Sequence, residues 1–223
     1  MRVLVLIIYS EDLPSYSRNR EGWRLYSKSN SSFDVYFMKF SKDHQSVTIE
    51  DDMIYMPGEE SLRNLSYKFI TSLENLSFKK YDFILRTNIS SFYVFHNLLP
   101  VLESLPKEKL LAGEVNGNYV SGAGMIFSPD VCELLIQNKD AVVHYDLSDP
   151  FDDVIMSFYL HKIHGIEFTQ TYPIRQNIEL PQNGLETTLP MNTFHFRLKQ
   201  ATPEGRMQEY EIMKNLYTRF YTL

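Results

Sequence analysis

Short apolar runs and helix-spaced apolar residues follow one another along this chain, which predicts strands and helices in alternation. A run of four to eight apolar, β-branched or aromatic residues between polar turns is typical of a strand. Such runs occupy residues 2–9, 33–40, 83–87, 110–114 and 119–127, and residues 191–198 also have an extended pattern. The first run is apolar almost throughout, which predicts a fully buried strand.

Apolar residues at spacings of three and four predict the helices. Residues 59–76 would turn one face inward, formed by Leu62, Leu65, Phe69, Leu73 and Leu76. The pattern Thr202-Pro203-Glu204 starts a last helix, which would bury Met207, Tyr210, Met213, Tyr217 and Phe220. Further helices are predicted at 16–28, after Ser128-Pro129, and at 151–162 after Asp149-Pro150. Ser91 would cap one more helix, which Pro100 would interrupt or end.

Alternating strands and helices predict an α/β fold, a Rossmann-like domain whose mostly parallel central sheet is flanked by helices. We expect a single domain over residues 1–223, which is a suitable length for one large α/β domain. Ligands of such sheets bind beyond the carboxyl ends of the strands. Three polar clusters follow predicted strands and should therefore converge: Ser10-Glu11-Asp12, Arg86-Thr87-Asn88, and the loop after Phe127.

The net charge and the cysteine count exclude several classes of protein. The net charge of −6 argues against a nucleic-acid-binding protein, which would usually be basic. A single cysteine, Cys132, excludes an internal disulfide and a cysteine-rich zinc site, and no other metal site is predicted.

Two local patterns bear on the compartment. The apolar run at the N-terminus is too short to span a bilayer and precedes no signal-peptide cleavage site, so we expect no transmembrane segment. Four Asn-x-Ser sequons occur, and a glycan on the one at Asn88 would obstruct the predicted ligand end of the sheet. We therefore expect that the chain either stays in a cytoplasm, that of a bacterium or of the host cell of a virus, or comes from an organism without this modification.

Several motifs appear in the order of one enzyme family. They are Arg20-Glu21-Gly22-Trp23, residues 60–68, the strand and turn at 83–90, Tyr119-Val120-Ser121-Gly122-Ala123-Gly124, Phe151-Asp152-Asp153-Val154, and Thr193-Phe194-His195-Phe196-Arg197. Together they resemble the β-1,3-galactosyltransferase and Fringe-like family of inverting glycosyltransferases, which have the GT-A fold. The resemblance spans about residues 1–200 and implies that residues 1–90 bind the nucleotide and residues 91–223 bind the acceptor and carry catalysis.

The sequence departs from that family at its metal-binding motif. Where the family has an acidic triplet that holds a divalent cation against the donor diphosphate, this chain has Asn88-Ile89-Ser90. Neutral oxygen donors bind magnesium or manganese weakly without a carboxylate. We therefore expect the divalent metal to be weakly bound or dispensable, with positive side chains offsetting the diphosphate charge instead.

The resemblance assigns a catalytic role to the acidic pair. Inverting transfer needs a base that takes the proton of the acceptor hydroxyl. Asp153 matches that base, and Asp152 would orient or tune it. The alternative is that both acids only stabilise the start of a helix.

Donor and sugar contacts are assigned to two further sets of residues. The sugar or acceptor would rest on Ser121, Gly122, Ala123 and Gly124, unless these residues only form a closely packed strand bend. The nucleotide sugar would contact Tyr9, Ser10, Arg20, Lys68, Arg86, Thr87, Asn88, His195, Arg197 and Lys199. For Arg86 the alternative is a salt bridge with Asp82 or Glu114, and for the residues after Phe194 it is a solvated strand face.

These expectations describe a hexosyltransferase. It would move a hexose from a nucleotide-diphosphate sugar, UDP-linked, to a hydroxyl of a glycan acceptor with inversion. One alternative is a catalytically silent relative that binds a sugar nucleotide or a glycan. A nucleotidyltransferase is disfavoured, because Ser10-Glu11-Asp12-Leu13-Pro14 is not a glycine-rich phosphate loop.

Overall fold

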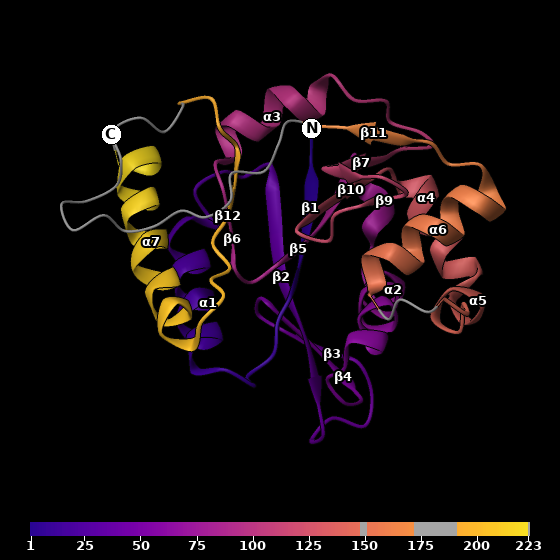
Figure 1. The fold of residues 1–223 in the computed structure, drawn as a ribbon, viewed down its shortest axis with the longest axis horizontal. Coiled ribbons are helices and arrows are strands. Elements are labelled where there is room, and N and C mark those ends of the chain that lie inside the picture. The colour runs from indigo at the N-terminus through magenta and orange to yellow at the C-terminus, as the bar shows by residue number, and fades with distance from the viewer. Residues whose placement is uncertain (148–150, 172–190, 223) are drawn as a thin grey trace. The chain divides into compact units, whose positions relative to one another are not determined.

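The computed structural model describes residues 1–147, 151–171 and 191–222 (Figure 1). The chain forms two compact units. The first, called the sheet unit below, comprises Met1–Ser10, Asp34–Asn88 and Leu105–Tyr172. The second, called the helical unit, comprises Glu11–Phe33, Ile89–Ser104 and Pro173–Leu223. The assignment of residues 1–90 and 91–223 to separate roles stays a prediction.

The sheet unit is built on a mostly parallel sheet, as predicted. Its order in the described part of the chain is β11 (Phe168–Gln170), β7 (Leu111–Gly113), β10 (Gly124–Phe127), β5 (Phe83–Asn88), β1 (Val3–Ile8), β2 (Phe33–Ser41), β4 (Met53–Pro57) and β3 (Thr48–Glu50). β1 and β5 pair in parallel at the centre, with Val3 opposite Phe83 and Ile8 opposite Asn88. β10 is antiparallel to both of its neighbours, and β3 is antiparallel to β4.

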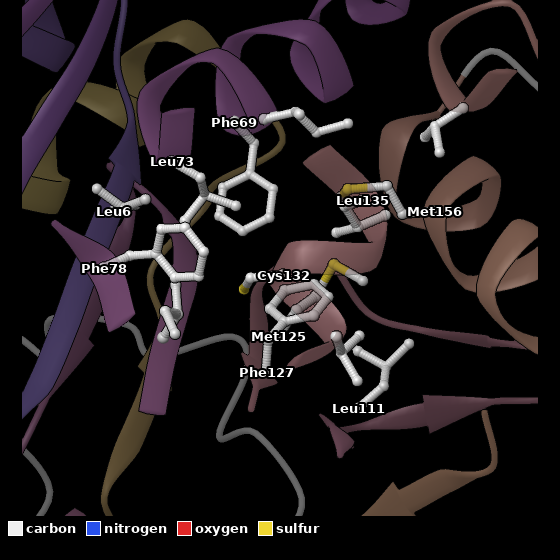
Figure 2. Close-up of a cluster of buried hydrophobic side chains, with 14 of the residues drawn as sticks. Leu6, Phe69, Leu73, Phe78, Leu111, Met125, Phe127, Cys132, Leu135 and Met156 are labelled. Atoms are coloured by element: carbon white, nitrogen blue, oxygen red, sulfur yellow. The ribbon is translucent and has the colours of Figure 1, made fainter. Parts of the chain in front are cut away.

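Helices cover the sheet with apolar residues. α2 (Leu65–Glu74), α4 (Pro129–Gln137) and α6 (Asp152–His164) contribute to one buried cluster. Figure 2 shows Phe69 and Leu73 from α2 in this cluster with Phe127 from β10 and Cys132 from α4. The cysteine is fully buried and burial raises its thiol pKa well above the ordinary value, which fits the predicted packing role. Shorter elements complete the unit: η1 (Leu62–Asn64), η2 (Phe78–Lys80), β8 (Val115–Asn116), β9 (Tyr119–Val120) and α5 (Lys139–Val143).

The helical unit packs α1 (Pro14–Tyr26) against α7 (Pro203–Tyr221), which lie side by side in Figure 1. Gly22 permits this close approach, because an added Cβ would lie 2.6 Å from the sulfur of Met213. α3 (Phe95–Glu103) and the antiparallel pair β6 (Ser91–Tyr93) and β12 (His195–Arg197) complete the unit. Its core is aromatic, with Trp23, Tyr26, Phe92, Phe95 and Tyr221 in ring contact.

Several local predictions are wrong in detail. Ser91 is not a helix cap, because it lies in β6 and α3 begins at Phe95 and continues through Pro100 to Glu103. The helix predicted at 59–76 begins as the short turn η1, which leaves Leu62 52% exposed. The strand predicted at 119–127 is interrupted between β9 and β10. The start of a helix at Asp149-Pro150 lies outside the described residues, although α6 follows it.

The inward face of α7 also differs from the prediction. Its buried residues are Glu209, Ile212, Met213, Leu216 and Phe220, whereas Met207 is exposed. Glu209 turns inward because its carboxylate accepts hydrogen bonds from Asn19 Nδ2 at 2.5 Å, Ser90 Oγ at 2.7 Å and the Gln200 amide at 3.1 Å. A buried carboxylate with several donors is tolerated where an unpaired one is not.

Candidate functional site

The candidate site of the sheet unit lies at the carboxyl end of β5. Because β1 runs parallel to β5, Tyr9 and Ser10 follow β1 at the same end as Asn88. The loop after Phe127 does not join them, because β10 is antiparallel and places Phe127 opposite Ile84, at the other end of β5. The turn that precedes β10, Ser121 to Ala123, reaches this end instead, since Gly124 pairs with Thr87.

Gly122 is the centre of the hydrogen bonding at this end. Its carbonyl oxygen accepts from Asn88 Nδ2 at 2.8 Å and also from a terminal nitrogen of Arg86. Its amide donates to Oδ2 of Asp153 at 2.7 Å. A side chain here would have to displace Arg86 or Asp153, because a Cβ would lie 2.6 Å from the Arg86 guanidinium and 2.8 Å from Oδ2 of Asp153.

The rest of the predicted sugar floor forms a tight turn around Gly122. The Ser121 carbonyl accepts the Gly124 amide at 3.1 Å, and the Ser121 amide donates to the Glu114 carbonyl at 2.8 Å. The carbonyl of Ala123 accepts the hydroxyl of Thr87 at 2.6 Å. The turn is therefore fastened to the end of β5 by two consecutive carbonyls, and whether a sugar rests on it stays a prediction.

Arg86 pairs with a residue that the sequence did not suggest as its partner. Its second terminal nitrogen lies 2.5 Å from Oδ2 of Asp152, and both side chains are almost fully buried, at 2% and 6% exposed. The expected alternative partners are not used: Asp82 contacts Lys107 and the Arg2 amide. The positive charge of Arg86 is therefore directed toward Asp152 and Gly122, inside the sheet unit.

The two acids at the start of α6 lie in different environments. Asp152 is 4% exposed, and burial raises the pKa of its carboxyl above the ordinary value, although the Arg86 guanidinium lowers it. Asp153 is only partly buried, and its Oδ1 accepts the Val154 amide at 3.0 Å while Oδ2 accepts the Gly122 amide. These two bonds orient Asp153 and use about half of the acceptor capacity of a carboxylate.

Lys68 contacts the chain directly after the end of β1. Its ammonium group donates to the Tyr9 carbonyl at 3.0 Å and to both oxygens of Glu60 at 2.6 and 2.7 Å, and it lies 4.6 Å from the centre of the Phe40 ring. The side chain is fully buried, so these contacts fix the chain that follows β1. Glu60 was not predicted as its partner, although both residues belong to the same motif.

The residues at the position of the metal motif do not fit a divalent cation. Asn88 directs its Nδ2 toward the Gly122 carbonyl, Ile89 is buried and apolar, and the Ser90 hydroxyl donates to Glu209. In residues 1–147, 151–171 and 191–222, no three His, Cys, Asp or Glu side chains are grouped as metal ligands. Divalent cations of this kind prefer carboxylate oxygens, and none of Asn88, Ile89 and Ser90 supplies one. The expected weak or dispensable metal stays a prediction.

The helical unit contains the other predicted donor contacts. Arg197 and Arg206 lie near Lys199, and burial together with these two arginines lowers the Lys199 pKa. His195 stacks on Tyr93 with ring centres 4.1 Å apart and is 3% exposed. Burial holds the pKa of His195 well below its ordinary value, so it is neutral at pH 7 and adds no charge to the arginines. Arg20 lies on α1, partly buried.

No helix in the described residues is long and apolar enough to cross a membrane.

No protein-family profile matches this sequence, and no curated protein matches it. Solved structures do resemble the fold. A glycosyltransferase involved in the glycosylation of the major capsid of PBCV-1 aligns with a TM-score of 0.62 at 11% identity, over 95% of this chain and 100% of that one.

A second solved structure, an active-site mutant of LgtC, aligns with a TM-score of 0.47 at 11% identity, over 100% of this chain and 97% of that one. This likeness is too slight to support an argument. The likeness to the PBCV-1 glycosyltransferase covers both chains almost completely, but its low identity shows only shared architecture. The chain therefore has the α/β fold of a known glycosyltransferase.

Proposed function

We propose that this protein is a glycosyltransferase with Asp153 as its general base. The observation that carries the proposal is the setting of Asp153: partly exposed, at the carboxyl end of the central strand, and oriented by two backbone amides. The shared fold with a glycosyltransferase supports this reading. Buried Asp152, paired with Arg86, would support the helix start rather than contact substrate.

The proposed reaction is the transfer of a hexose from a UDP-linked sugar to a glycan hydroxyl with inversion. The acceptor oxygen attacks the anomeric carbon, and the bond from that carbon to the diphosphate oxygen breaks. The electron pair of that bond leaves with the diphosphate, and the acceptor proton passes to Asp153.

The growing charge on the leaving diphosphate requires positive groups. Arg197 and Lys199 remain the proposed source, because Arg86 already holds Asp152 and His195 is neutral. An arginine can bind two phosphate oxygens at once, whereas lysine acts as a point charge. The negative charge of a bound phosphate would act against the two arginines and raise the Lys199 pKa again.

Donor binding is tested first by thermal shift against UDP-, GDP- and dTDP-sugars, with and without manganese. A ligand that binds the native state raises its stability by mass action. Stabilisation by one nucleotide family would identify the base of the donor. The absence of stabilisation by every sugar nucleotide would count against the proposal.

Catalysis is tested by Asp153→Asn. We expect donor affinity to change little and transfer to fall by at least ~100-fold, the usual scale for a lost base. Asp130→Asn is a matched control, because Asp130 also lies in a first helical turn and accepts a loop amide, that of Lys109, at 2.8 Å. Transfer by Asp153→Asn within threefold of wild type would remove Asp153 from the role.

A silent relative that only binds a sugar nucleotide or glycan is the second candidate. The neutral Asn88-Ile89-Ser90, with its polar side chains bonded internally, favours it. Binding without transfer to any of a panel of glycan acceptors would support this alternative.

A further inference from the structure

Gly122 connects three side chains: Asn88 and Arg86, whose sequence roles had suggested direct contact with the donor, and the proposed base Asp153. We propose that Asn88 and Arg86 are positioning residues, which hold the base Asp153 in place through Gly122. The proposal rests on the function assigned above to Asp153. It replaces direct donor binding by Asn88 and Arg86 with an action through the turn.

The geometry constrains Gly122 from both sides. Two donors, Asn88 Nδ2 and the Arg86 guanidinium, fix its carbonyl, and its own amide binds Oδ2 of Asp153 at 2.7 Å. Without these two donors, the 122–123 peptide could rotate about the Cα–C bond of Gly122, and the turn that directs the Gly122 amide at Asp153 would lose its restraint. Glycine has no side chain to resist that rotation, so the two donors supply the restraint.

Arg86 adds a second connection between the same parts. One end of its guanidinium binds the Gly122 carbonyl and the other binds Asp152, the first residue of α6. Asp153 is the next residue, so the turn and the helix start are fastened together on both sides of the base. The rigid planar fork of arginine suits this task, and a lysine would reach only one of the two acceptors.

Asn88 is suited to its place because an amide can donate. A carboxylate at this position has no proton to donate at neutral pH and would face the Gly122 carbonyl oxygen. Introducing an acidic residue at position 88 should therefore weaken the site. If position 88 were instead a lapsed metal ligand, an acid there would improve manganese-dependent activity.

The first experiment compares Asn88→Ala and Asn88→Asp with wild type in kcat, donor KM and donor affinity by calorimetry, with and without manganese. We expect kcat to fall at least ~10-fold in both, since small displacements of a catalytic group are costly. Donor affinity should stay within about threefold of wild type, because the effect is on orientation. Asn75→Ala is the control, since its amide donates to the Thr71 carbonyl at 2.9 Å, away from Gly122.

The outcomes separate the possibilities. Wild-type kcat in Asn88→Ala, or a raised donor KM with unchanged kcat, would overturn the proposal. Manganese-dependent activation of Asn88→Asp would also overturn it. Unchanged kcat in Asn75→Ala would show that losing an amide-to-carbonyl bond elsewhere in the sheet unit does not slow transfer.

A second measurement does not depend on activity. Hydrogen exchange of the Gly122 amide, followed by NMR, should accelerate at least ~10-fold in Asn88→Ala and in Asp153→Ala, which removes the acceptor, and stay unchanged in Asn75→Ala. Unchanged exchange in Asn88→Ala would refute the restraint even if the protein proved to have no transferase activity. Conversely, full transfer by Asp153→Asn would refute the proposed function. The exchange rate of the Gly122 amide would still show whether Asn88 restrains the turn.

Arg86 is tested by a pair of variants that separates folding from positioning. Arg86→Met leaves Asp152 buried without its partner, whereas Arg86→Met with Asp152→Leu removes both charges. We expect the double variant to recover thermal stability relative to the single one, while kcat stays low because the Gly122 carbonyl has lost a donor. Recovery of kcat together with stability would show that the pair has only a structural role.

Discussion

Replacing Arg86 by methionine should strongly destabilise the protein, because it leaves a carboxylate in the core without its ion pair. The side chains of Arg86 and Asp152 are 2% and 6% exposed, so water cannot replace the lost partner. Removing one member of such a pair costs about 3–5 kcal/mol. For a domain of this size, about 2–4 °C in Tm accompanies each kcal/mol, so Tm should fall by roughly 6–20 °C.

The loss should depend on pH with a definite sign. Burial already raises the pKa of Asp152 above its ordinary value in the wild type. Its contribution to stability is therefore largest below the ordinary pKa and is lost as pH rises through the folded value. Removing the guanidinium raises the folded value further. The destabilisation by Arg86→Met should thus be smaller at pH 5 than at pH 8.

Urea unfolding of wild type and Arg86→Met at both pH values measures this directly. Lys79→Met is the control, because it breaks an exposed pair with Glu133, which lies 2.8 Å away, with the two side chains 67% and 42% exposed. Such surface pairs contribute about 0–1 kcal/mol. A destabilisation by Arg86→Met below about 1 kcal/mol, or one of equal size at pH 5 and pH 8, would refute the reasoning.

Three further predictions concern His195, Gly122 and Arg197. Burial lowers the pKa of His195, so the stability that this residue contributes is present above its ordinary pKa and is lost as pH falls. Measured by urea unfolding, His195→Phe should therefore lose less stability between pH 7 and pH 5 than the wild type. An equal loss of unfolding free energy in both proteins would contradict this. Gly122→Ala should cost about 1–3 kcal/mol and abolish most transfer, since its Cβ would lie 2.6 Å from the Arg86 guanidinium; an active, stable variant would show that the turn can adjust. Transfer should survive EDTA but fall sharply in turnover and donor affinity in Arg197→Ala, whereas full loss in EDTA with recovery in manganese would show that a cation is required.

Local patterns in the sequence were sufficient for most of the secondary structure. The apolar run of β1 and the proline-marked starts of α4 and α7 were correctly predicted, because apolar patterning and helix starts are local properties of the sequence. The side chain of Thr202 accepts the Gly205 amide at 3.1 Å, as a capping residue should. The alternation of these elements was enough to predict a mostly parallel α/β sheet.

Directions and partners depended on contacts between distant residues. The reversed direction of β10 cannot be read from its apolar residues, since either direction buries them equally, yet it decides that Gly122 lies at the end of β5. Arg86 and Asp152 are 66 residues apart, and Glu209 is 119 residues from Ser90. A buried charge takes whichever partner the fold brings within reach, so only the tertiary structure identified these pairs. The acids of α6 were visible in the sequence, whereas the division between a buried Asp152 and a partly exposed, oriented Asp153 came from packing alone.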